Sequence, residues 1–358
     1  MTRKVLFLVP YPLQESPSQR FRFEQYFQLL EKHGIQFTVQ SFLDSNNWQI
    51  FFKSGHKGSK IFALIAGFAK RVVALLKAPF YHFIFIHREM TPAGPPLFEW
   101  ILAKILKKKI IYDFDDAIWL PDGAPESGLM NFFKWRNKVT SICKWSYKIS
   151  CGNEYLSSYA RRYNTRVLYN PTTIDTLWHN PDNHQKSPNH HIVIGWTGSH
   201  STLKYLNELE SVLQRLESQF PMVIFMVIAN RKPDLKLNTL HYVPWKKKTE
   251  IPDLLLMDIG IMPLPNDEWA KGKCGFKALQ YMALEIPVVA SPVGTSSTII
   301  DDGDNGFLCT SSDEWENALT KLIQDETLRK HMGKQGRKKV IERYSVTSNS
   351  SNFLLLFE

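Results

Sequence analysis

Three carboxylates stand within four residues of one segment, Tyr112-Asp-Phe-Asp-Asp-Ala-Ile-Trp119. The apolar residues before them predict a buried strand, so Asp113 and Asp115 are expected on one side of its end and Asp116 near the following turn. Crowded carboxylates repel one another and often have raised pKa values. The segment therefore indicates ligand binding or proton handling, with a solvated acidic helix start as the alternative.

Two further polar clusters follow predicted strands in the first half of the chain. In parallel sheets, ligands bind at the carboxyl ends of the strands, so these side chains are also candidates for a site. They are Arg20, Arg22, His87, Arg88 and Glu89. A lone histidine such as His87 as often satisfies backbone groups as it contacts a ligand.

The densest cationic pattern lies in the second half, over residues 271–294. Gly272 and Gly275 precede a predicted helix, so bare backbone N–H groups and the positive end of the helix dipole can face an anion. At 100° per residue, Lys273, Lys277 and Gln280 fall within about 60° of one another. Two ammonium groups and an amide suit a diphosphate and a ribose, and a solvated basic face is the alternative.

Familiar nucleotide motifs are missing from the sequence. The 18 glycines include no G-x-G pair, and there is no G-x-x-x-x-G-K-[ST] segment. Dinucleotide-dependent hydride transfer and P-loop chemistry therefore lose support. The four cysteines form no C-x-x-C pair, and we expect buried free thiols in a reducing compartment.

Short apolar runs alternate with amphipathic stretches, which predicts two doubly wound α/β domains with parallel sheets. The expected organisation is an N-terminal Rossmann-like acceptor-binding domain over residues 1–176, a linker over 177–190, a C-terminal Rossmann-like donor domain over 191–345, and a tail over 346–358 that packs back on the first domain. The predicted strands are residues 5–9, 35–42, 83–87, 109–112, 147–151, 166–169, 192–195, 222–228, 241–243, 259–264, 287–290 and 305–309. The main predicted helices are residues 21–33, 202–220, 274–284, a helix after a capping box at Ser311 and Glu314, and 328–344.

The net charge of +10 is uneven along the 358 residues. Residues 1–176 carry 24 basic and 13 acidic side chains, whereas residues 177–358 carry 20 and 21. Only the first half is therefore expected to meet an anionic partner, and an anionic membrane surface or a lipid diphosphate fits better than nucleic acid, because the basic residues follow no single stripe.

Residues 60–77 predict an amphipathic helix whose lysines lie opposite its apolar arc. Two interpretations stay open: a helix packed on the sheet with a wet basic face, or a helix lying on an anionic bilayer. Trp48, Phe51 and Phe52 just before it favour the membrane. The apolar arc consists of Ile61, Phe62, Leu64, Ile65, Phe68, Val72, Leu75 and Leu76.

No apolar run approaches the length needed to cross a bilayer, and the short apolar run at residues 5–9 fits a first strand better than a signal peptide. The expected location is the cytoplasm, with peripheral attachment to the inner face of the plasma membrane as an option.

Residues 271–294 resemble the donor-binding segment of the family 4 retaining glycosyltransferases, glycosyl transferases group 1, which have the GT-B fold. The resemblance extends to Asp302-Gly-Asp-Asn-Gly-Phe-Leu308 and back to Ile194-Gly-Trp-Thr-Gly198, and covers the second domain. This chain departs from the family at three positions. Gly272 and Gln280 stand where the family has two glutamates, and Trp196 stands where an arginine is expected, which indicates a divergent subgroup.

The resemblance implies two domains facing each other across a cleft and a hexosyltransferase that needs neither metal nor cofactor. Its donor would be a nucleotide-sugar, and its acceptor a lipid-linked or polysaccharide glycan of the cell surface. The expected donor-binding residues are Gly198, Lys204, Lys273, Gly275, Lys277, Gln280 and Gly294. The expected catalytic residues are Asp115, Asp116 and His87, and the expected acceptor-binding residues are Arg20, Arg22, Arg88 and Glu89.

Three alternatives remain at this stage. A sugar-nucleotide epimerase of the same architecture would turn over the donor without an acceptor. A non-catalytic sugar-nucleotide or nucleic-acid binding protein is suggested by the pI of 9.2 and the altered glutamates. Asp113-Phe-Asp115 also resembles the D-x-D of metal-dependent GT-A enzymes, but that interpretation leaves the second domain unexplained.

Overall fold

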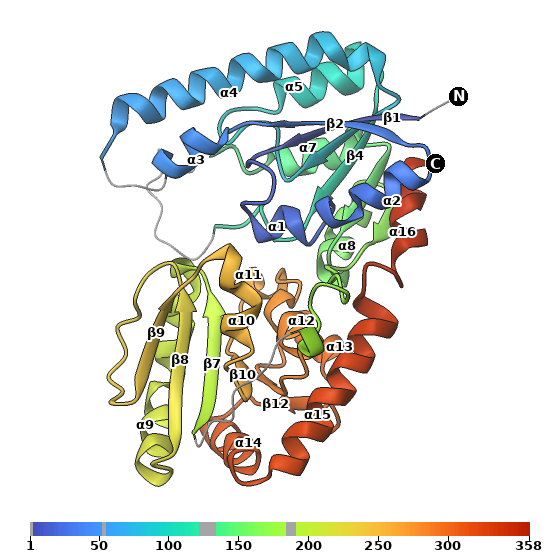
Figure 1. The fold of residues 1–358 in the computed structure, drawn as a ribbon. Helices are drawn as coiled ribbons and strands as arrows, with labels where there is room; N and C mark the ends of the chain where they lie inside the picture. Colours follow the sequence, from blue (N-terminus) through green and yellow to red (C-terminus); the bar gives the residue numbers. More distant parts are fainter. Residues whose placement is uncertain (1–2, 52–54, 122–133, 184–190) are drawn as a thin grey trace. The chain divides into compact units, whose positions relative to one another are not determined.

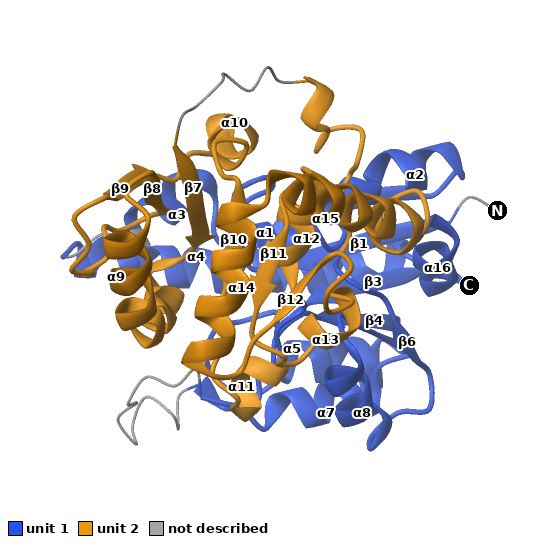
Figure 2. Ribbon diagram, turned by 90° about the horizontal axis from the view of Figure 1, so that it is seen from below, with its two compact units in different colours: residues 1–172, 272–274, 349–358 blue, residues 173–271, 275–348 orange. Residues whose placement is uncertain are grey.

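A computed structural model describes residues 3–51, 55–121, 134–183 and 191–358 of the chain. They divide into two compact units, coloured separately in Figure 2. Unit 1 comprises Met1–Thr172, Gly272–Cys274 and Asn349–Glu358, and unit 2 comprises Thr173–Lys271 and Gly275–Ser348. Of the predicted linker over residues 177–190, residues 184–190 lie outside the described residues, as does Phe52.

Unit 1 contains a six-stranded, all-parallel sheet in the order β2-β1-β3-β4-β5-β6. Its central strands β1, β3 and β4 are mostly apolar and buried, as expected for a sheet covered on both faces. The strands are β1 (Lys4–Val9), β2 (Gln36–Ser41), β3 (Phe83–His87), β4 (Lys109–Phe114), β5 (Lys148–Cys151) and β6 (Val167–Tyr169). The strand order reverses between β1 and β3, so polar residues after these strands lie where ligands bind in such sheets.

Several helices surround this sheet in Figure 1. They are α1 (Pro17–Arg20), α2 (Phe27–Lys32), α3 (Ser45–Phe51), α4 (Lys57–Lys77), α5 (Leu97–Trp100), α7 (Lys138–Trp145), α8 (Glu154–Arg161) and α16 (Ser350–Leu354). The helix predicted over residues 21–33 is broken, because α1 ends at Arg20 and a 3-10 turn over Glu24–Tyr26 precedes α2. In α16, Phe353 stacks on Tyr26 with ring centroids 4.1 Å apart, within unit 1.

Unit 2 repeats the architecture with the strand order β12-β11-β10-β7-β8-β9, again all parallel. Its strands are β7 (Ile192–Gly198), β8 (Val223–Ala229), β9 (Leu240–Pro244), β10 (Ile259–Met262), β11 (Val288–Ala290) and β12 (Gly306–Leu308). Its helices are α9 (Glu210–Gln219), α10 (Glu250–Leu254), α11 (Glu268–Lys271), α12 (Phe276–Ala283), α13 (Ser296–Ile299), α14 (Ser312–Gln324) and α15 (Glu326–Lys339). Here the order reverses between β7 and β10, which places the expected ligand position at the end of β7.

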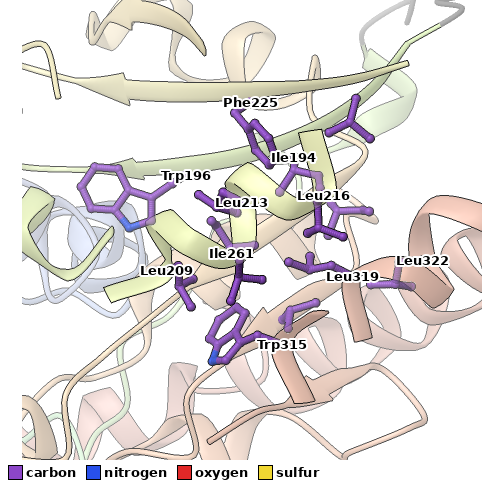
Figure 3. Close-up of a cluster of buried hydrophobic side chains, with 14 of the residues drawn as sticks. Ile194, Trp196, Leu209, Leu213, Leu216, Phe225, Ile261, Trp315, Leu319 and Leu322 are labelled. Carbon is purple, nitrogen blue, oxygen red and sulfur yellow. The ribbon is translucent and has the colours of Figure 1, made fainter. Parts of the chain in front are cut away.

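The core of unit 2 packs β7 and β8 against α9 and α14. Figure 3 shows Trp196 from β7 and Trp315 from α14 in the same cluster as Leu213 and Leu319. Trp196 is 1% exposed. Burial of an aromatic side chain this large contributes several kcal/mol to folding, so the residue after Gly195 is fixed firmly in place.

The structure confirms the predicted strands within a few residues at either end, and it confirms the capping box at Ser311 and Glu314. Besides the broken 21–33 helix, two further predicted helices differ from the structure. The first half of the 202–220 helix is a 3-10 helix over His200–Leu209. The 274–284 helix begins only at Phe276, because Gly275 has φ +68°, a left-handed conformation that interrupts the helix.

The four cysteines are free and buried, as expected. Among the described residues, no helix combines the length and the apolar character that crossing a bilayer requires.

Candidate functional site

The carboxylates and His87 meet in unit 1 because β3 and β4 are neighbours. The sheet register pairs His87 with Asp113, and the Nδ1–H of His87 donates to Oδ2 of Asp113 at 2.8 Å. Arg22 donates to the other oxygen of the same carboxylate, and the Ser150 hydroxyl donates to it at 2.6 Å. The Asp113 side chain is 1% exposed, so a strand-end acid and a loop arginine form a buried ion pair.

The pKa of Asp113 lies far below its usual range rather than above it. Burial opposes ionisation of the carboxyl, but the charge of Arg22 and the hydrogen bond from His87 outweigh burial. The pKa of Asp115 is also lowered, since the attraction of Arg88 outweighs burial. The expectation of raised pKa values was therefore wrong for both acids, because each carboxylate has its own guanidinium.

Arg88 joins the other two carboxylates. Its Nε donates to Asp115 at 2.8 Å and its Nη2 to Asp116 at 2.7 Å. Arg88 has φ +61°, a left-handed backbone that costs a non-glycine residue about 1 kcal/mol. Its carbonyl accepts a hydrogen bond from the Tyr112 hydroxyl at 2.7 Å. Strain of this kind persists where surrounding contacts hold it, and here it aims the guanidinium at the two acids.

Lys273 also reaches this cluster. Its Nζ donates to Oδ1 of Asp116 at 2.8 Å, and residues 272–274 belong to unit 1. The expectation that Lys273 shares one helix face with Lys277 and Gln280 was wrong, because Lys273 precedes the glycine at which the helix begins. The charge of Lys273 is thus already balanced by a carboxylate.

His87 is held between two acids. Its side chain is fully buried, and its Nε2 lies 4.0 Å from Oδ1 of Asp115. Among the described residues, Nε2 has no hydrogen-bond partner. The hydrogen bond to Asp113 fixes the ring orientation, so Nε2 is the nitrogen that remains for a ligand.

The candidate acceptor-binding residues have different surroundings. Arg22 is 1% exposed and also donates to the carbonyl of Asn170, so its contacts are those of a positioning residue. Arg20 lies over the ring of Phe21. Glu89 forms an ion pair with Lys138 and is 30% exposed.

A second cluster lies in unit 2 at the end of β7. The Nζ of Lys277, in the first turn of α12, lies 4.1 Å from the centroid of the Trp196 ring and 3.5 Å from the Thr202 hydroxyl oxygen. A Cβ on Gly198 would lie 2.4 Å from the Trp196 ring and 2.8 Å from the Lys277 Nζ. The glycine therefore leaves room for the cation at the topological switch point of this sheet.

Other candidate donor residues shape the same region of unit 2. Gly275 precedes α12, and a Cβ there would lie 2.3 Å from Ile299. Gly294 has φ +59°, and a Cβ would lie 2.9 Å from the Lys271 carbonyl oxygen, so glycine is required. Gln280 is 2% exposed, and its Nε2 has no hydrogen-bond partner among the described residues. Lys204 is exposed on the 3-10 helix near the ring of Tyr205.

Sequence reasoning missed the residues that support these clusters. Trp196 supplies the aromatic face under Lys277, and Thr202 its hydroxyl contact. Ser150 and Asn170 complete the buried network around Asp113; the Asn170 amide donates to the Ser150 hydroxyl at 3.2 Å. Trp196 was noted in the sequence only as a departure from the family pattern and not as a site residue, and small polar residues at the ends of β5 and β6 give no signal by themselves.

Residues 185–339 match the family model described as "Glycosyl transferases group 1". This match confirms the resemblance found in the sequence over the second half of the chain. Two curated proteins are also similar to part of this chain. The chain is 25% identical over 177 residues to "Capsular polysaccharide biosynthesis glycosyltransferase CapM" of Staphylococcus aureus, covering 46% of this chain and 45% of that one. It is 30% identical over 100 residues to "N-acetyl-alpha-D-glucosaminyl L-malate synthase" of Bacillus anthracis, covering 27% and 25%. The matches thus span less than half the length of either relative.

Solved structures resemble the whole chain. A glycosyltransferase from Rickettsia africae superposes with a TM-score of 0.71 at 14% identity, covering 99% of this chain and 98% of that one. Anabaena Alr3699/HepE, solved with UDP-glucose, superposes with a TM-score of 0.65 at 15% identity, covering 98% of both chains. These similarities show the GT-B fold, with two parallel-sheet α/β domains. The GT-A interpretation of Asp113-Phe-Asp115 was therefore wrong.

Proposed function

We propose that this protein is a retaining glycosyltransferase that moves a sugar from a nucleotide-sugar to a glycan or lipid-linked acceptor of cell-surface glycan synthesis. The observation that carries the proposal is the Lys277 ammonium group beside Gly198 and the start of α12, at the switch point of the family-matched unit. A cation, a bare glycine backbone and a helix N-terminus together suit a diphosphate.

The leaving diphosphate gains negative charge as the glycosidic bond breaks, and a fixed cation stabilises that charge. Lys277 has this role in the proposal. The aromatic face of Trp196 holds the Lys277 ammonium group in place. Gln280 takes the ribose position that the resemblance assigns to a glutamate, and its unpaired buried amide supports this role.

We assign the unit 1 cluster to the transferred sugar and the acceptor. Asp115 and Asp116 both accept hydrogen bonds from Arg88, and both carboxylates are partly exposed, at 13% and 16%. They are hydrogen-bond acceptors suited to sugar hydroxyls. Asp113 and Arg22, by contrast, are sealed in the protein and position His87.

The relatives guide the choice of substrates. One curated relative is named for capsular polysaccharide biosynthesis, and one structural relative was solved with UDP-glucose. UDP-glucose and other UDP-sugars are therefore the first donors to test, and cell-surface glycans the first acceptors.

The test is to incubate the purified protein with a panel of nucleotide-sugars, with and without glycan acceptors. The proposal predicts nucleoside diphosphate release that rises with a suitable acceptor, and a product whose anomeric configuration by NMR equals that of the donor. Activity should persist in EDTA, since Lys277 replaces a metal in this account. Conversion of the donor to an epimer without acceptor would instead identify an epimerase, and no turnover of any donor would overturn the proposal.

A further inference from the structure

The helix α4 presents its apolar side to solvent. Seven of the large hydrophobic side chains on α4 and the turn after it are at least 44% exposed: Ile61, Phe62, Ile65, Val72, Val73, Leu76 and Phe80. At 100° per residue, the six within the helix fall in one arc of about 120°. This arc, together with Phe80, is called the α4 face below. A helix packed by its apolar side would bury these residues instead.

Small residues and one arginine form the opposite, buried side of α4. The buried residues are Ala63, Gly67, Arg71 and Ala74. A Cβ on Gly67 would lie 2.5 Å from the Phe42 ring, so the helix is packed closely along this side.

Arg71 fixes which side of α4 points inward. Its guanidinium donates to the carbonyls of Met90 and Val9, each at 2.7 Å, and of Gln40 at 2.9 Å. Burial lowers the pKa of Arg71 to about 9. These contacts hold the Arg71 side of the helix against the ends of β1 and β2, and Leu64 and Phe68 also pack on the cluster of Phe42 and Leu43. The helix is therefore packed, as one of the two interpretations from the sequence expected, but only part of its predicted apolar arc is covered, and its contact with a bilayer stays a prediction.

The surroundings of the α4 face are cationic. The helix contains no acidic residue, and Lys57 and Lys77 are exposed at its two ends. Between residues 57 and 110 the only acids are Glu89, which pairs with Lys138, and Glu99, which is 1% exposed. At the far end, a pocket of about 510 Å³ contains Phe80 among basic side chains. Its ionisable lining residues are Arg3, His82, Lys107, Lys108, Lys109 and Glu358.

We propose that the α4 face docks on the surface of an anionic lipid bilayer, with its apolar side chains at the acyl boundary and the lysines at the headgroups. Contiguous exposed apolar surface with a basic rim marks an interaction site with an anionic partner. Asp44, which forms an ion pair with Lys70, and Glu358 are the acids found near this rim among the described residues, so basic side chains outnumber acidic ones. A second copy of this chain would bring the same excess of basic side chains, so self-association leaves the charges unbalanced.

The test is flotation of the full-length protein with two kinds of vesicle. One kind consists of phosphatidylcholine alone, and the other contains phosphatidylglycerol as one part in three. Phe62→Ser/Ile65→Ser/Leu76→Ser removes three exposed side chains of the α4 face. Leu177→Ser/Met222→Ser/Leu256→Ser is the matched control, since these unit 2 side chains are also exposed. Thermal unfolding of both variants checks that they are folded. We expect the wild type to bind the anionic vesicles only. The α4 variant should bind them with an affinity lower by about tenfold or more, and the control variant with unchanged affinity.

Two further variants test the contribution of the lysine charges. Lys57→Glu/Lys77→Glu should abolish the preference for phosphatidylglycerol, whereas Lys334→Glu/Lys338→Glu on α15, with the same change in net charge, should keep it. The proposal is overturned if the α4 variant binds the anionic vesicles as tightly as the wild type does, or if the wild type binds both kinds of vesicle equally. A dimer in sedimentation velocity that the α4 variant abolishes, with no vesicle binding, assigns the face to self-association instead. Vesicle binding is measured without donor or acceptor, so its outcome is independent of the proposed transferase activity.

Discussion

The Nζ of Lys277 lies 4.1 Å from the centroid of the Trp196 ring and 3.5 Å from the Thr202 hydroxyl oxygen. The cation is thus held at the end of β7, at the switch point of the unit 2 sheet. Lys273, four residues earlier, has its charge balanced by Asp116. Of these two lysines, Lys277 is therefore the one we expect to bind the donor diphosphate.

Lys277→Ala should weaken nucleotide-sugar binding by about 10- to 100-fold, because a charged hydrogen bond to phosphate contributes about 1.5–3 kcal/mol. Lys321→Ala is the matched control, since Lys321 also lies over an aromatic ring, that of Phe307, in unit 2. Calorimetric titration measures both. Equal affinities of wild type and Lys277→Ala would remove Lys277 from the donor site.

Asp115→Asn should lower the transfer rate by at least about tenfold while leaving the affinity for the nucleoside diphosphate alone unchanged, because Asp115 is assigned to the transferred sugar and the acceptor and not to the diphosphate. Initial rates and titrations with the nucleoside diphosphate separate the two effects. Asp304→Asn, at an exposed acid, is the control and should match the wild type. A variant with full activity would refute the role of Asp115.

Asp113→Asn should reduce the free energy of unfolding by about 3–5 kcal/mol, because it leaves the Arg22 guanidinium buried with no counter-charge. Denaturant unfolding measures the loss, with Asp304→Asn again as the control. A loss below about 1 kcal/mol would mean that the buried pair does not anchor this network.

Acid should destabilise the protein through the same carboxylates. The pKa values of Asp113 and Asp115 are lower in the folded state, so the stability they contribute is present above the unfolded pKa of about 4 and is lost as the pH falls below it. The free energy of unfolding should therefore decrease from pH 5 to pH 3, and less steeply in Asp115→Asn. The same slope in both proteins would contradict the lowered pKa of Asp115.

Gly333→Ala should destabilise unit 2 by about 1–3 kcal/mol, because its Cβ would lie 2.0 Å from the backbone oxygen of Glu285, which cannot rotate away. Gly58→Ala, where a Cβ meets nothing within 4 Å, should be neutral or slightly stabilising. Thermal unfolding distinguishes the two. A neutral Gly333→Ala would show that α15 can move away from the end of α12.

The strands could be predicted because buried parallel strands are continuous apolar runs. Residues 83–87 were predicted with the bounds that β3 has. The breaks in the helices were harder to predict. The chain leaves the helical path at Arg22, whose side chain bonds to Asp113, 91 residues away, and no local pattern contains that contact.

The site could be predicted only in part, for the same reason. Strand ends identified Asp113, Asp115, Asp116 and His87, but the partner of each carboxylate depends on which strands are neighbours. The α4 helix shows a further limit. Its periodicity identified the apolar residues, but the carbonyls around Arg71 and the packing of Leu64 and Phe68 determine which of them face outward.

The donor site at Lys277 is tested by calorimetric titration of the wild-type protein with UDP-, GDP-, ADP- and dTDP-sugars, repeated with Lys277→Ala. At least one nucleotide-sugar should bind the wild type, and Lys277→Ala should lose most of that affinity. If no nucleotide-sugar binds, or if one binds both proteins equally, the donor site proposed at the end of β7 is contradicted.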